Sequence, residues 1–398
     1  MDLRAKQFVD KYLGGVAILV LRPVTMALGF LLRRNHLLVL QGELAWIKLV
    51  GGGSLLLAMP LLLGMRKKMP GVRFVLVTTP SVRPFAELIG VFDEYQVIED
   101  RGVFRLTASA IRVLVRSFRI DTVVDLEVYS RLSTVFSTLT MARNRISFWL
   151  EDIFWRRGLA SHLVFFNRFS GAFYFYERIA ELYSCQVAGQ EECLAVLTRQ
   201  VGPVPTKNPG RICIGFSCSE LGKERMLTAE QWVQVFRKNP RPNFAEFVFL
   251  GVASERPIAE LIMDKIRMQF PQLKLINKAG ELSLKESVAL LLGSTEFWGI
   301  DSGLLHLARI GSLKTISFWG PTAPQTRLRS DWRTNDEVYY KKIACSPCVH
   351  VSEEPPCRGD NRCIQGLFSD SDFSAWSPIE YPKDRIARNN GKPSCGNS

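Results

Sequence analysis

The strongest constraint on this chain is an alternation of apolar strands and helical stretches that runs through the first half, stops, and begins again. This order of elements is typical of parallel α/β domains. The clearest predicted strands are 44–49, 73–79 and 122–128 in the first half, and 212–217, 246–251 and 296–300 in the second. We therefore predict an α/β fold in which two Rossmann-like domains face a cleft.

The two halves are separated by VGPVPTKNPGR, residues 201–211, whose prolines and glycines predict a linker. Residues 146–188 are rich in aromatic side chains, and their pattern predicts mostly helix. The predicted division is an amphipathic membrane-interface segment (1–36), a first Rossmann-like domain (37–200), the linker (201–211), a second Rossmann-like domain (212–340), a cysteine-rich loop (341–366) and a C-terminal tail (367–398).

The charge balance favours anionic partners. The 398 residues contain 51 Lys and Arg against 38 Asp and Glu, a formal net charge of +13, which attracts phosphates, acidic lipids or nucleic acid. The basic residues are spread along the chain and are not interleaved with aromatic residues in one patch, which argues against nucleic acid. Most of the nine cysteines are scattered, a pattern that favours a reducing compartment.

The N-terminal stretch GVAILVLRPVTMALGFLL, residues 15–32, is just long enough to cross a bilayer. Arg22 and Pro23 stand in its middle, and a central Arg costs about 2.5–3.5 kcal/mol, so a span is the least favoured interpretation. No small-residue cleavage site follows, which argues against a cleaved signal peptide. Two alternatives remain: an amphipathic helix at the cytoplasmic membrane interface, or a helix packed on the protein's own surface. Basic residues flank the stretch: Lys6, Lys11, Arg33 and Arg34.

Three glycines, Gly51, Gly52 and Gly53, lie between a predicted strand and a predicted helix. A P-loop would need a lysine before its hydroxyl residue, but Ser54 follows glycine directly. A dinucleotide fold would need an acidic residue at the end of the second strand, which instead ends in threonines. The triplet is then either a turn whose backbone approaches a ligand closely or a tight turn with no further role.

A second strand-to-helix turn is GIDSGLLHLA, residues 299–308. Asp301, Ser302 and Gly303 follow a predicted strand and begin a predicted helix, and His306 lies in its first turns. Free backbone N–H groups and the helix dipole at this point favour a phosphate. The alternative is ordinary capping of the helix by Asp301 or Ser302.

The string DSGLLHLARIGSLKTISFWGPTAP resembles the signature of glycosyltransferase family nine, the heptosyltransferases of lipopolysaccharide assembly. The resemblance covers roughly residues 40–365 and is stronger in the second half. It implies a GT-B architecture with the nucleotide-sugar donor in the second domain, the acceptor in the first, inversion at the anomeric carbon and no cofactor or metal required for catalysis. The donor-site residues that it implies are Lys223, Glu255, Asp301, Ser302, Gly303, His306, Gly320 and Thr322, and the acceptor-side loop is Gly51, Gly52 and Gly53.

The chain departs from the family after the glycine loop, where relatives usually place an aspartate as general base and this chain has Ser54. A serine cannot take a proton at neutral pH without help. Asp125 and Glu127, in VVDLEVYSR, lie near the carboxyl end of a predicted strand, the edge that faces the cleft in such sheets. We predict Ser54, Asp125 and Glu127 as the catalytic candidates; the alternative is that the two acids only pair with Arg131.

A cysteine cluster lies after the last predicted strand. Its spacing, Cys-x2-Cys followed by two more thiols in a short loop rich in Pro and Gly, is typical of a tetrahedral structural zinc site. Reversible disulfides or reduced thiols are the alternatives. The four candidate ligands are Cys345, Cys348, Cys357 and Cys363.

Together these observations predict an inverting glycosyltransferase that moves a heptose-like sugar from a nucleoside diphosphate to a lipopolysaccharide-type or other lipid-linked acceptor. It would act in the cytoplasm, peripheral to the cytoplasmic face of the inner membrane and bound to its anionic surface. Two other functions compete with it: a GT-B sugar epimerase, and a non-catalytic protein that binds nucleotide-sugars or glycolipids, which Ser54 makes plausible.

Overall fold

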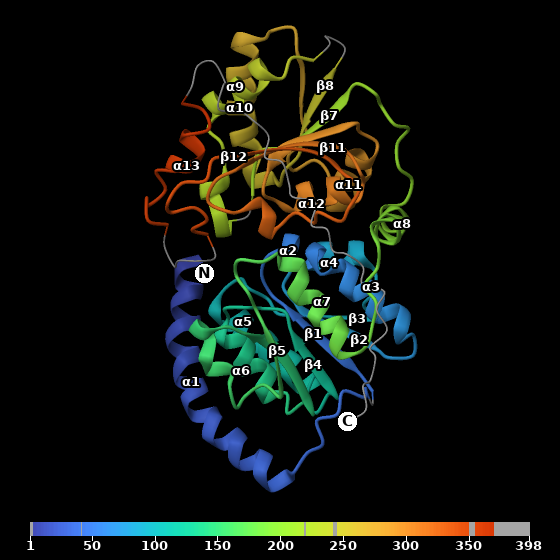
Figure 1. Ribbon diagram of the computed structural model, residues 1–398, viewed down its shortest axis with the longest axis vertical. Helices are drawn as coiled ribbons and strands as arrows, with labels where there is room; N and C mark the ends of the chain where they lie inside the picture. Colours follow the sequence, from blue (N-terminus) through green and yellow to red (C-terminus); the bar gives the residue numbers. More distant parts are fainter. Residues whose placement is uncertain (1–2, 41, 219, 242–244, 350–354, 370–398) are drawn as a thin grey trace, which may run out of the picture.

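The computed structural model of the protein describes residues 3–40, 42–218, 220–241, 245–349 and 355–369. Two six-stranded sheets, each entirely parallel within these residues, form two stacked α/β domains (Figure 1). The predicted α/β, GT-B-like architecture is confirmed. The cores of the strands are apolar because parallel sheets are covered by helices on both faces, and every residue of β1 and β2 is buried.

The first sheet has the order β3-β2-β1-β4-β5-β6. Its strands are β1 (Leu44–Lys48), β2 (Phe74–Thr78), β3 (Glu94–Val97), β4 (Thr122–Asp125), β5 (Asn144–Trp149) and β6 (His162–Phe165). Its helices are α1 (Leu3–Leu32), α2 (Gly52–Leu57), α3 (Met59–Lys68), α4 (Arg83–Ile89), α5 (Val103–Arg116), α6 (Arg131–Leu139), the 3-10 helix η1 (Glu151–Arg156), α7 (Ala172–Leu182) and α8 (Gln190–Val201).

The second sheet has the order β12-β11-β10-β7-β8-β9. Its strands are β7 (Arg211–Gly215), β8 (Glu246–Phe249), β9 (Lys274–Asn277), β10 (Glu296–Ile300), β11 (Lys314–Trp319) and β12 (Asn335–Tyr340). The remaining elements are η2 (Glu220–Arg225), α9 (Ala229–Lys238), η3 (Ala253–Glu255), α10 (Arg256–Gln269), α11 (Leu284–Leu292), α12 (Gly303–Ile310), η4 (Pro324–Thr326) and α13 (Arg362–Gln365). Most of the predicted tail lies outside the described residues.

The prediction of mostly helix for 146–188 is wrong in its first part. β5 and β6 occupy this region and pair with each other, Ile146 with His162 through Trp149 with Phe165. Aromatic and β-branched residues favour strands, and this preference prevailed over the helical spacing. The edge strands β3 and β12 were not predicted, because half-exposed edges carry polar residues that hide the strand pattern.

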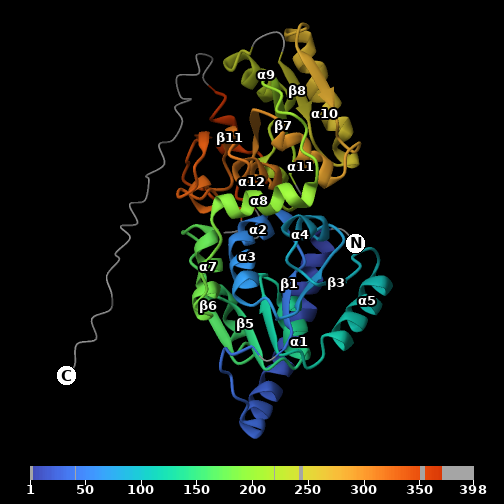
Figure 2. The same cartoon turned by 90° about the vertical axis from the view of Figure 1, so that its right-hand side faces the viewer.

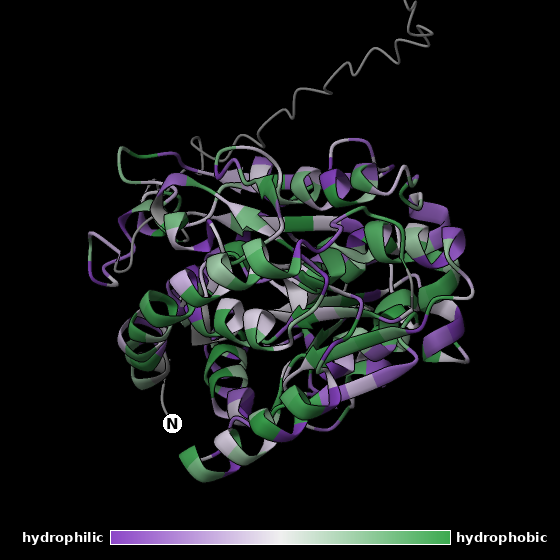
Figure 3. Cartoon of the chain, turned by 90° about the horizontal axis from the view of Figure 1, so that it is seen from below, coloured by the Kyte–Doolittle hydropathy of each residue, from purple (hydrophilic) through white to green (hydrophobic). Residues whose placement is uncertain are grey.

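The helix α1 lies outside the first domain, along α6, and reaches past the end of the sheet opposite the second domain (Figures 1 and 2). Seen from below, green helical segments lie at the edge of the molecule next to the N-terminus (Figure 3). The segment Gln7–Leu32 within α1 is long and apolar enough to cross a membrane, and almost none of it is buried in the protein.

The two domains meet at the carboxyl ends of their strands. The loop after β1 contacts the turn after β10, so that α2 packs against α12. On the side, α8 spans the boundary: the Gln190 side chain donates to the carbonyl of Arg309 (2.8 Å) and accepts from the Arg333 amide (2.8 Å). In open α/β sheets ligands bind beyond the carboxyl ends of the strands, so this boundary is where a site is expected.

One prediction concerns the packing of α3. A Cβ on Gly64 would collide with the carbonyl of Gln186 and lie 3.1 Å from Val187 Cα, and both obstacles are backbone atoms. Gly64→Ala should therefore lower the thermal unfolding midpoint by several degrees, which corresponds to a loss of about 1–3 kcal/mol. Gly29→Ala, where nothing lies within 4 Å, is the control and should leave the midpoint unchanged or raise it. Equal midpoints for the two variants would contradict the packing.

Candidate functional site

The turn after β10 brings a carboxylate, an arginine and a histidine together. The Asp301 carboxylate is almost fully buried and lies 3.2 Å from Nη1 of Arg225, which also donates to the Asp301 carbonyl (2.8 Å). On its other side, Asp301 Oδ1 lies 3.8 Å from Nε2 of His306. The carboxylate is thus held between the η2 segment and the first turn of α12.

Neither Asp301 nor Ser302 caps α12, so the interpretation of this turn as ordinary N-capping is wrong. Ser302 occupies the N-cap position but makes no cap hydrogen bond, and its buried hydroxyl has no hydrogen-bond partner among the described residues. The buried hydroxyl of Thr322, in the following Gly-Pro-Thr turn, lies next to the Asp301 carboxylate and helps to lower its pKa. Buried hydroxyls are normally satisfied, and a ligand at the start of α12 would satisfy that of Ser302.

The pKa values at this turn set its charge. Burial alone would raise the pKa of Asp301, but Arg225 and Arg327 outweigh it and hold the pKa below its usual value, so Asp301 is ionised. Burial lowers the pKa of His306 to about 4, although Asp301 opposes the shift. His306 is therefore neutral at pH 7, and it serves a phosphate as a hydrogen-bond donor rather than as a cation.

The glycine loop of the first domain lies directly against this turn. Gly51 adopts a left-handed conformation (φ 79°) that favours glycine. A Cβ on Gly53 would lie 3.4 Å from the backbone of Gly303 and 3.7 Å from the His306 ring, and one on Gly52 would collide with the Phe85 ring. The loop's close approach, predicted toward a ligand, is in this structure an approach to the second domain.

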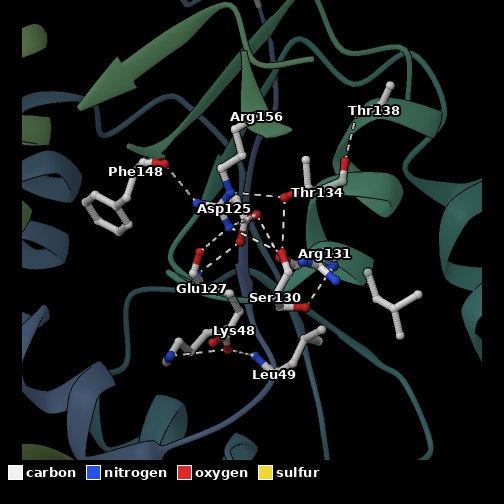
Figure 4. A network of polar contacts seen from close by, with 12 residues as sticks. Lys48, Leu49, Asp125, Glu127, Ser130, Arg131, Thr134, Thr138, Phe148 and Arg156 are labelled. Carbon is white, nitrogen blue, oxygen red and sulfur yellow. Dashed lines mark hydrogen bonds and ion pairs between the residues drawn. The ribbon is translucent and has the colours of Figure 1, made fainter. Parts of the chain in front are cut away.

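Asp125 lies in a buried polar network at the end of β4 (Figure 4). Its carboxylate accepts from the Glu127 amide (3.0 Å) and the Ser133 hydroxyl (2.8 Å) and pairs with Arg156 (3.3 Å). Arg156 is itself fully buried and also donates to the Thr134 hydroxyl and to the carbonyls of three residues, Glu127, Ser130 and Phe148. The carboxylate of Asp125 is therefore buried and occupied by contacts within the protein.

Glu127 follows two residues later and faces the glycine loop. Its Oε1 accepts from the amides of Leu49 (2.7 Å) and Val50 (2.9 Å) and lies 3.2 Å from Nζ of Lys48 (Figure 4). Within the described residues, Oε2 accepts no hydrogen bond. The alternative prediction, that the two acids pair with Arg131, is wrong. Asp125 pairs with Arg156 and Glu127 with Lys48, while Arg131 lies over the Trp155 ring.

Ser54 lies in the first turn of α2, where its hydroxyl donates to the Gly51 carbonyl (2.7 Å). The buried Tyr176 of α7 is its neighbour: burial raises the pKa of Tyr176, and Ser54, Lys48 and Arg327 act against that rise. Tyr176 and Arg327 come from different domains, and the charge of Arg327 acts on Tyr176 in the first and on Asp301 in the second.

The other predicted donor residues lie in further segments of the second domain. Lys223 is exposed in η2, two residues before Arg225, and its side chain has no partner among the described residues. Glu255 closes η3 after β8 and accepts from the Val252 amide (2.8 Å). Gly320 lies under α13, where a Cβ would meet Cys363 Sγ at 2.8 Å. Their roles toward a donor remain predictions.

The four clustered cysteines are free thiols near the Gly-Pro-Thr turn. Burial raises the pKa of Cys363 to about 11, with smaller contributions from Cys348 and Cys357, so these thiols are neighbours. In the part of the chain that the structure describes, no three His, Cys, Asp or Glu side chains are arranged to hold a metal ion. The zinc site stays a prediction.

Comparison with known proteins agrees with this geometry. The family model "Glycosyltransferase family 9 (heptosyltransferase)" matches residues 198–357, the linker, the second domain and part of the cysteine loop. Over these residues, less than half of the chain, the protein is similar to glycosyltransferase family 9. Lipooligosaccharide heptosyltransferase 2 of Haemophilus influenzae is 33% identical over 75 residues, 19% of this chain and 21% of that protein. This match therefore spans about a fifth of the curated relative's length.

Solved structures with the same fold cover most of the chain and both domains. The heptosyltransferase WaaC of E. coli with ADP-2-deoxy-2-fluoro heptose has a TM-score of 0.57 at 13% identity, over 82% of this chain and 99% of that one. The ADP-heptose lps heptosyltransferase II of E. coli has a TM-score of 0.55 at 15% identity, over 83% and 99%. At such identity the likeness shows a shared fold.

The sequence analysis missed several residues of this candidate site. Lys48 ends an apolar strand immediately before the glycine loop, and Arg225 follows Lys223 by two residues. These positions next to predicted site residues could have indicated both side chains from the sequence. Arg327 and Tyr176 carry no local signal, because only the packing of the two domains places them together.

The buried network makes a prediction for stability. Arg156→Met would leave the Asp125 carboxylate buried without its cation, which costs about 3–5 kcal/mol. The double variant Arg156→Met/Asp125→Asn should be less destabilised than the single one, because the unpaired charge is gone. Arg178→Met, which removes an exposed pair with Glu181, is the control and should change the thermal midpoint little. A single variant as stable as this control would contradict the role of the pair.

His306 makes a prediction for pH dependence. Between pH 6.5 and about 4 the unfolded chain protonates this histidine while the folded protein does not, so the folded state loses stability as the pH falls through this window, by about 3 kcal/mol in all. His306→Asn should flatten that part of the curve of thermal midpoint against pH. Burial raises the pKa of Asp125 to about 6, which makes the stability of the folded state rise as the pH falls. Asp125 is present in both proteins, so its effect cancels when their two curves are compared. Parallel curves would refute the assignment.

Proposed function

We propose that the protein is an inverting glycosyltransferase that works without a catalytic metal. It transfers a sugar from a nucleoside diphosphate bound at the α12 turn to an acceptor hydroxyl bound beside the glycine loop. The observation that carries the proposal is the meeting of these two loops, Gly53 against Gly303, with an ionised Asp301 and the unpartnered Ser302 hydroxyl on one side and Glu127 on the other.

The donor side has the groups that a departing diphosphate needs. The amides at the start of α12 and the Ser302 hydroxyl donate to phosphate oxygens, and neutral His306 adds a further donor. Positive charge comes from Lys223 and Arg327, whose side chains have no ion-pair partner in the described residues. Asp301, fixed by Arg225, orients the sugar hydroxyls, and Glu255 and Thr322 complete the nucleotide-sugar site.

Glu127 is the general base in this proposal. Two backbone amides and Lys48 fix one carboxylate oxygen, which leaves Oε2 to accept the proton of the acceptor hydroxyl as that oxygen attacks the anomeric carbon. Ser54, bonded to its own loop, positions the acceptor. Asp125 acts through Glu127, whose amide it binds, and is a positioning residue.

The similar proteins suggest the substrates. The E. coli heptosyltransferase WaaC was solved with ADP and with ADP-2-deoxy-2-fluoro heptose, and the curated relative is by its name a lipooligosaccharide heptosyltransferase. We infer a heptose or related sugar as the transferred group, and a lipopolysaccharide-type or other lipid-linked acceptor at the cytoplasmic face of the inner membrane.

The test is nucleoside diphosphate release measured with and without acceptor. With ADP-heptose and a deacylated lipopolysaccharide core, release should require the acceptor, and Glu127→Gln should lower kcat by about 10²–10⁴-fold with little change in donor affinity. Glu281→Gln, an exposed carboxylate of the second domain, is the matched control and should leave kcat unchanged.

Three results would contradict the proposal. A sugar that is altered but not transferred would indicate an epimerase, and donor binding without release in the presence of every acceptor tested would indicate a binding protein. Full activity in Glu127→Gln would remove Glu127 as the base. If ADP-heptose does not stabilise the protein thermally, a panel of other nucleoside diphosphate sugars identifies the donor first.

A further inference from the structure

The helix α1 touches the first domain along only one narrow stripe. Gly14 and Ile18 are buried, and Leu21, Thr25 and Leu28 are half-buried, a spacing of three or four residues that marks a single helix face. A Cβ on Gly14 would lie 2.8 Å from the Cβ of Arg131 at the start of α6. The helix therefore lies close against α6 without being surrounded by protein.

Polar contacts fix both ends of this segment to the first domain. The Asp10 carboxylate accepts from the Ser130 hydroxyl (2.7 Å) and from the amides of Arg131 (3.0 Å) and Leu132 (2.9 Å), and so caps the N-terminus of α6. Just beyond the end of α1, Arg34 donates to the Met141 carbonyl (2.7 Å). If residues 7–32 crossed a bilayer, the Asp10 contacts would have to break and the buried face of α1 would have to separate from α6.

The rest of α1 is exposed and almost uniformly apolar. No acidic residue occurs between Asp10 and Glu43. Such a continuous apolar surface is rare on a soluble monomer and marks an interaction site. The exposed large side chains are Phe8, Tyr12, Leu13, Val16, Leu19, Val20, Val24, Met26, Phe30, Leu31 and Leu32.

The η1 segment extends this surface. A Cβ on Gly158 would lie 3.5 Å from the Met26 side chain and 3.6 Å from Arg22, so the segment that follows η1 touches the middle of α1. Phe154, within η1, is 62% exposed. An aromatic ring beside an apolar helix is typical of a membrane-water interface.

The positive charges at this surface favour an anionic membrane as its binding partner. Lys11, Arg22 and Arg33 are exposed along and beside the apolar face, and anionic lipid head groups are complementary to them. A second copy of the chain would bring the same cations and no acids to its own α1 face, an arrangement that like charges oppose.

We propose that the outward face of α1, with Phe154, is a monotopic docking surface for an anionic bilayer. The helix lies in the membrane interface, its apolar side chains enter the lipid, and its cations contact the head groups, while Asp10 holds the first domain against the membrane.

This surface connects to the proposed acceptor side of the cleft. Asp10 binds Ser130 and Arg131, and the carbonyl of Ser130 is a partner of Arg156, which pairs with Asp125 next to Glu127. This consequence rests on the proposed function: a lipid-linked acceptor remains in the bilayer while its head group reaches the cleft, so the docked enzyme meets its acceptor without extracting it.

The test is sedimentation of the full chain with vesicles. The protein should bind vesicles of three parts phosphatidylcholine to one part phosphatidylglycerol, and bind pure phosphatidylcholine vesicles less. Leu19→Glu should reduce binding about tenfold or more. Met268→Glu is the matched control: Met268 is as exposed as Leu19, 76% in each case, but lies on α10 of the second domain, and its variant should bind like the wild type. Arg22→Gln should weaken the preference for anionic vesicles.

Other outcomes overturn the proposal. Equal binding by Leu19→Glu and Met268→Glu would exclude α1 as the docking surface. A wild-type dimer that Leu19→Glu converts to a monomer, without vesicle binding by either protein, would show that a second copy covers the face. Unchanged thermal midpoints confirm that the variants fold, as expected for exposed positions.

A second readout separates this inference from the proposed function. Leu19→Glu should keep its activity on a deacylated, soluble acceptor and lose it on the acceptor embedded in vesicles. If no variant transfers sugar to any acceptor, the proposed function fails while vesicle binding still decides the docking surface. If transfer to embedded acceptor survives in Leu19→Glu, docking through α1 fails while the transferase proposal stands.

Discussion

The first domain depends on the buried guanidinium of Arg156. Its hydrogen bonds and ion pair join the end of β4, the start of α6 and η1, three segments that no sheet pairing connects at this point. A buried charge is tolerated only where its partners are complete, so the network forces these segments into one arrangement. That arrangement directs Glu127 toward the amides before the glycine loop, and through Ser130 it reaches the contact that fixes α1.

The second constraint is steric and lies between the domains. Two parallel sheets that meet by their carboxyl ends bring two helix starts together, and the contact of Gly53 with Gly303 leaves no room for side chains between them. The same geometry brings the groups proposed for the acceptor and for the donor to one boundary. Asp301 and His306 are buried there, and electrostatic interactions are strengthened where water is excluded.

The fold class and the two strand-to-helix turns that meet at the domain boundary were predictable from local patterns. Strand and helix alternation, the linker and two strand-to-helix turns lie in contiguous residues, and parallel sheets place such turns at one edge. The errors came where local patterns compete: β5 and β6 were predicted as helix, and β3 and β12 lacked an apolar signal. The partners of Asp125 and Glu127 were also wrong, because Arg131 is near them in sequence whereas Arg156 and Lys48 are near them only in space.

The sequence by itself determined the two-domain α/β architecture, the strand-to-helix turn at Asp301 and the apolar, basic character of the N-terminal segment, because each is a property of neighbouring residues. Only the tertiary structure decided that Asp125 is enclosed while Glu127 faces the loop, that His306 is neutral, that Arg327 reaches both sides of the boundary, and that α1 shows its apolar face outward. Burial and the pairing of distant charges set these features, and both arise only when segments far apart in the chain pack together.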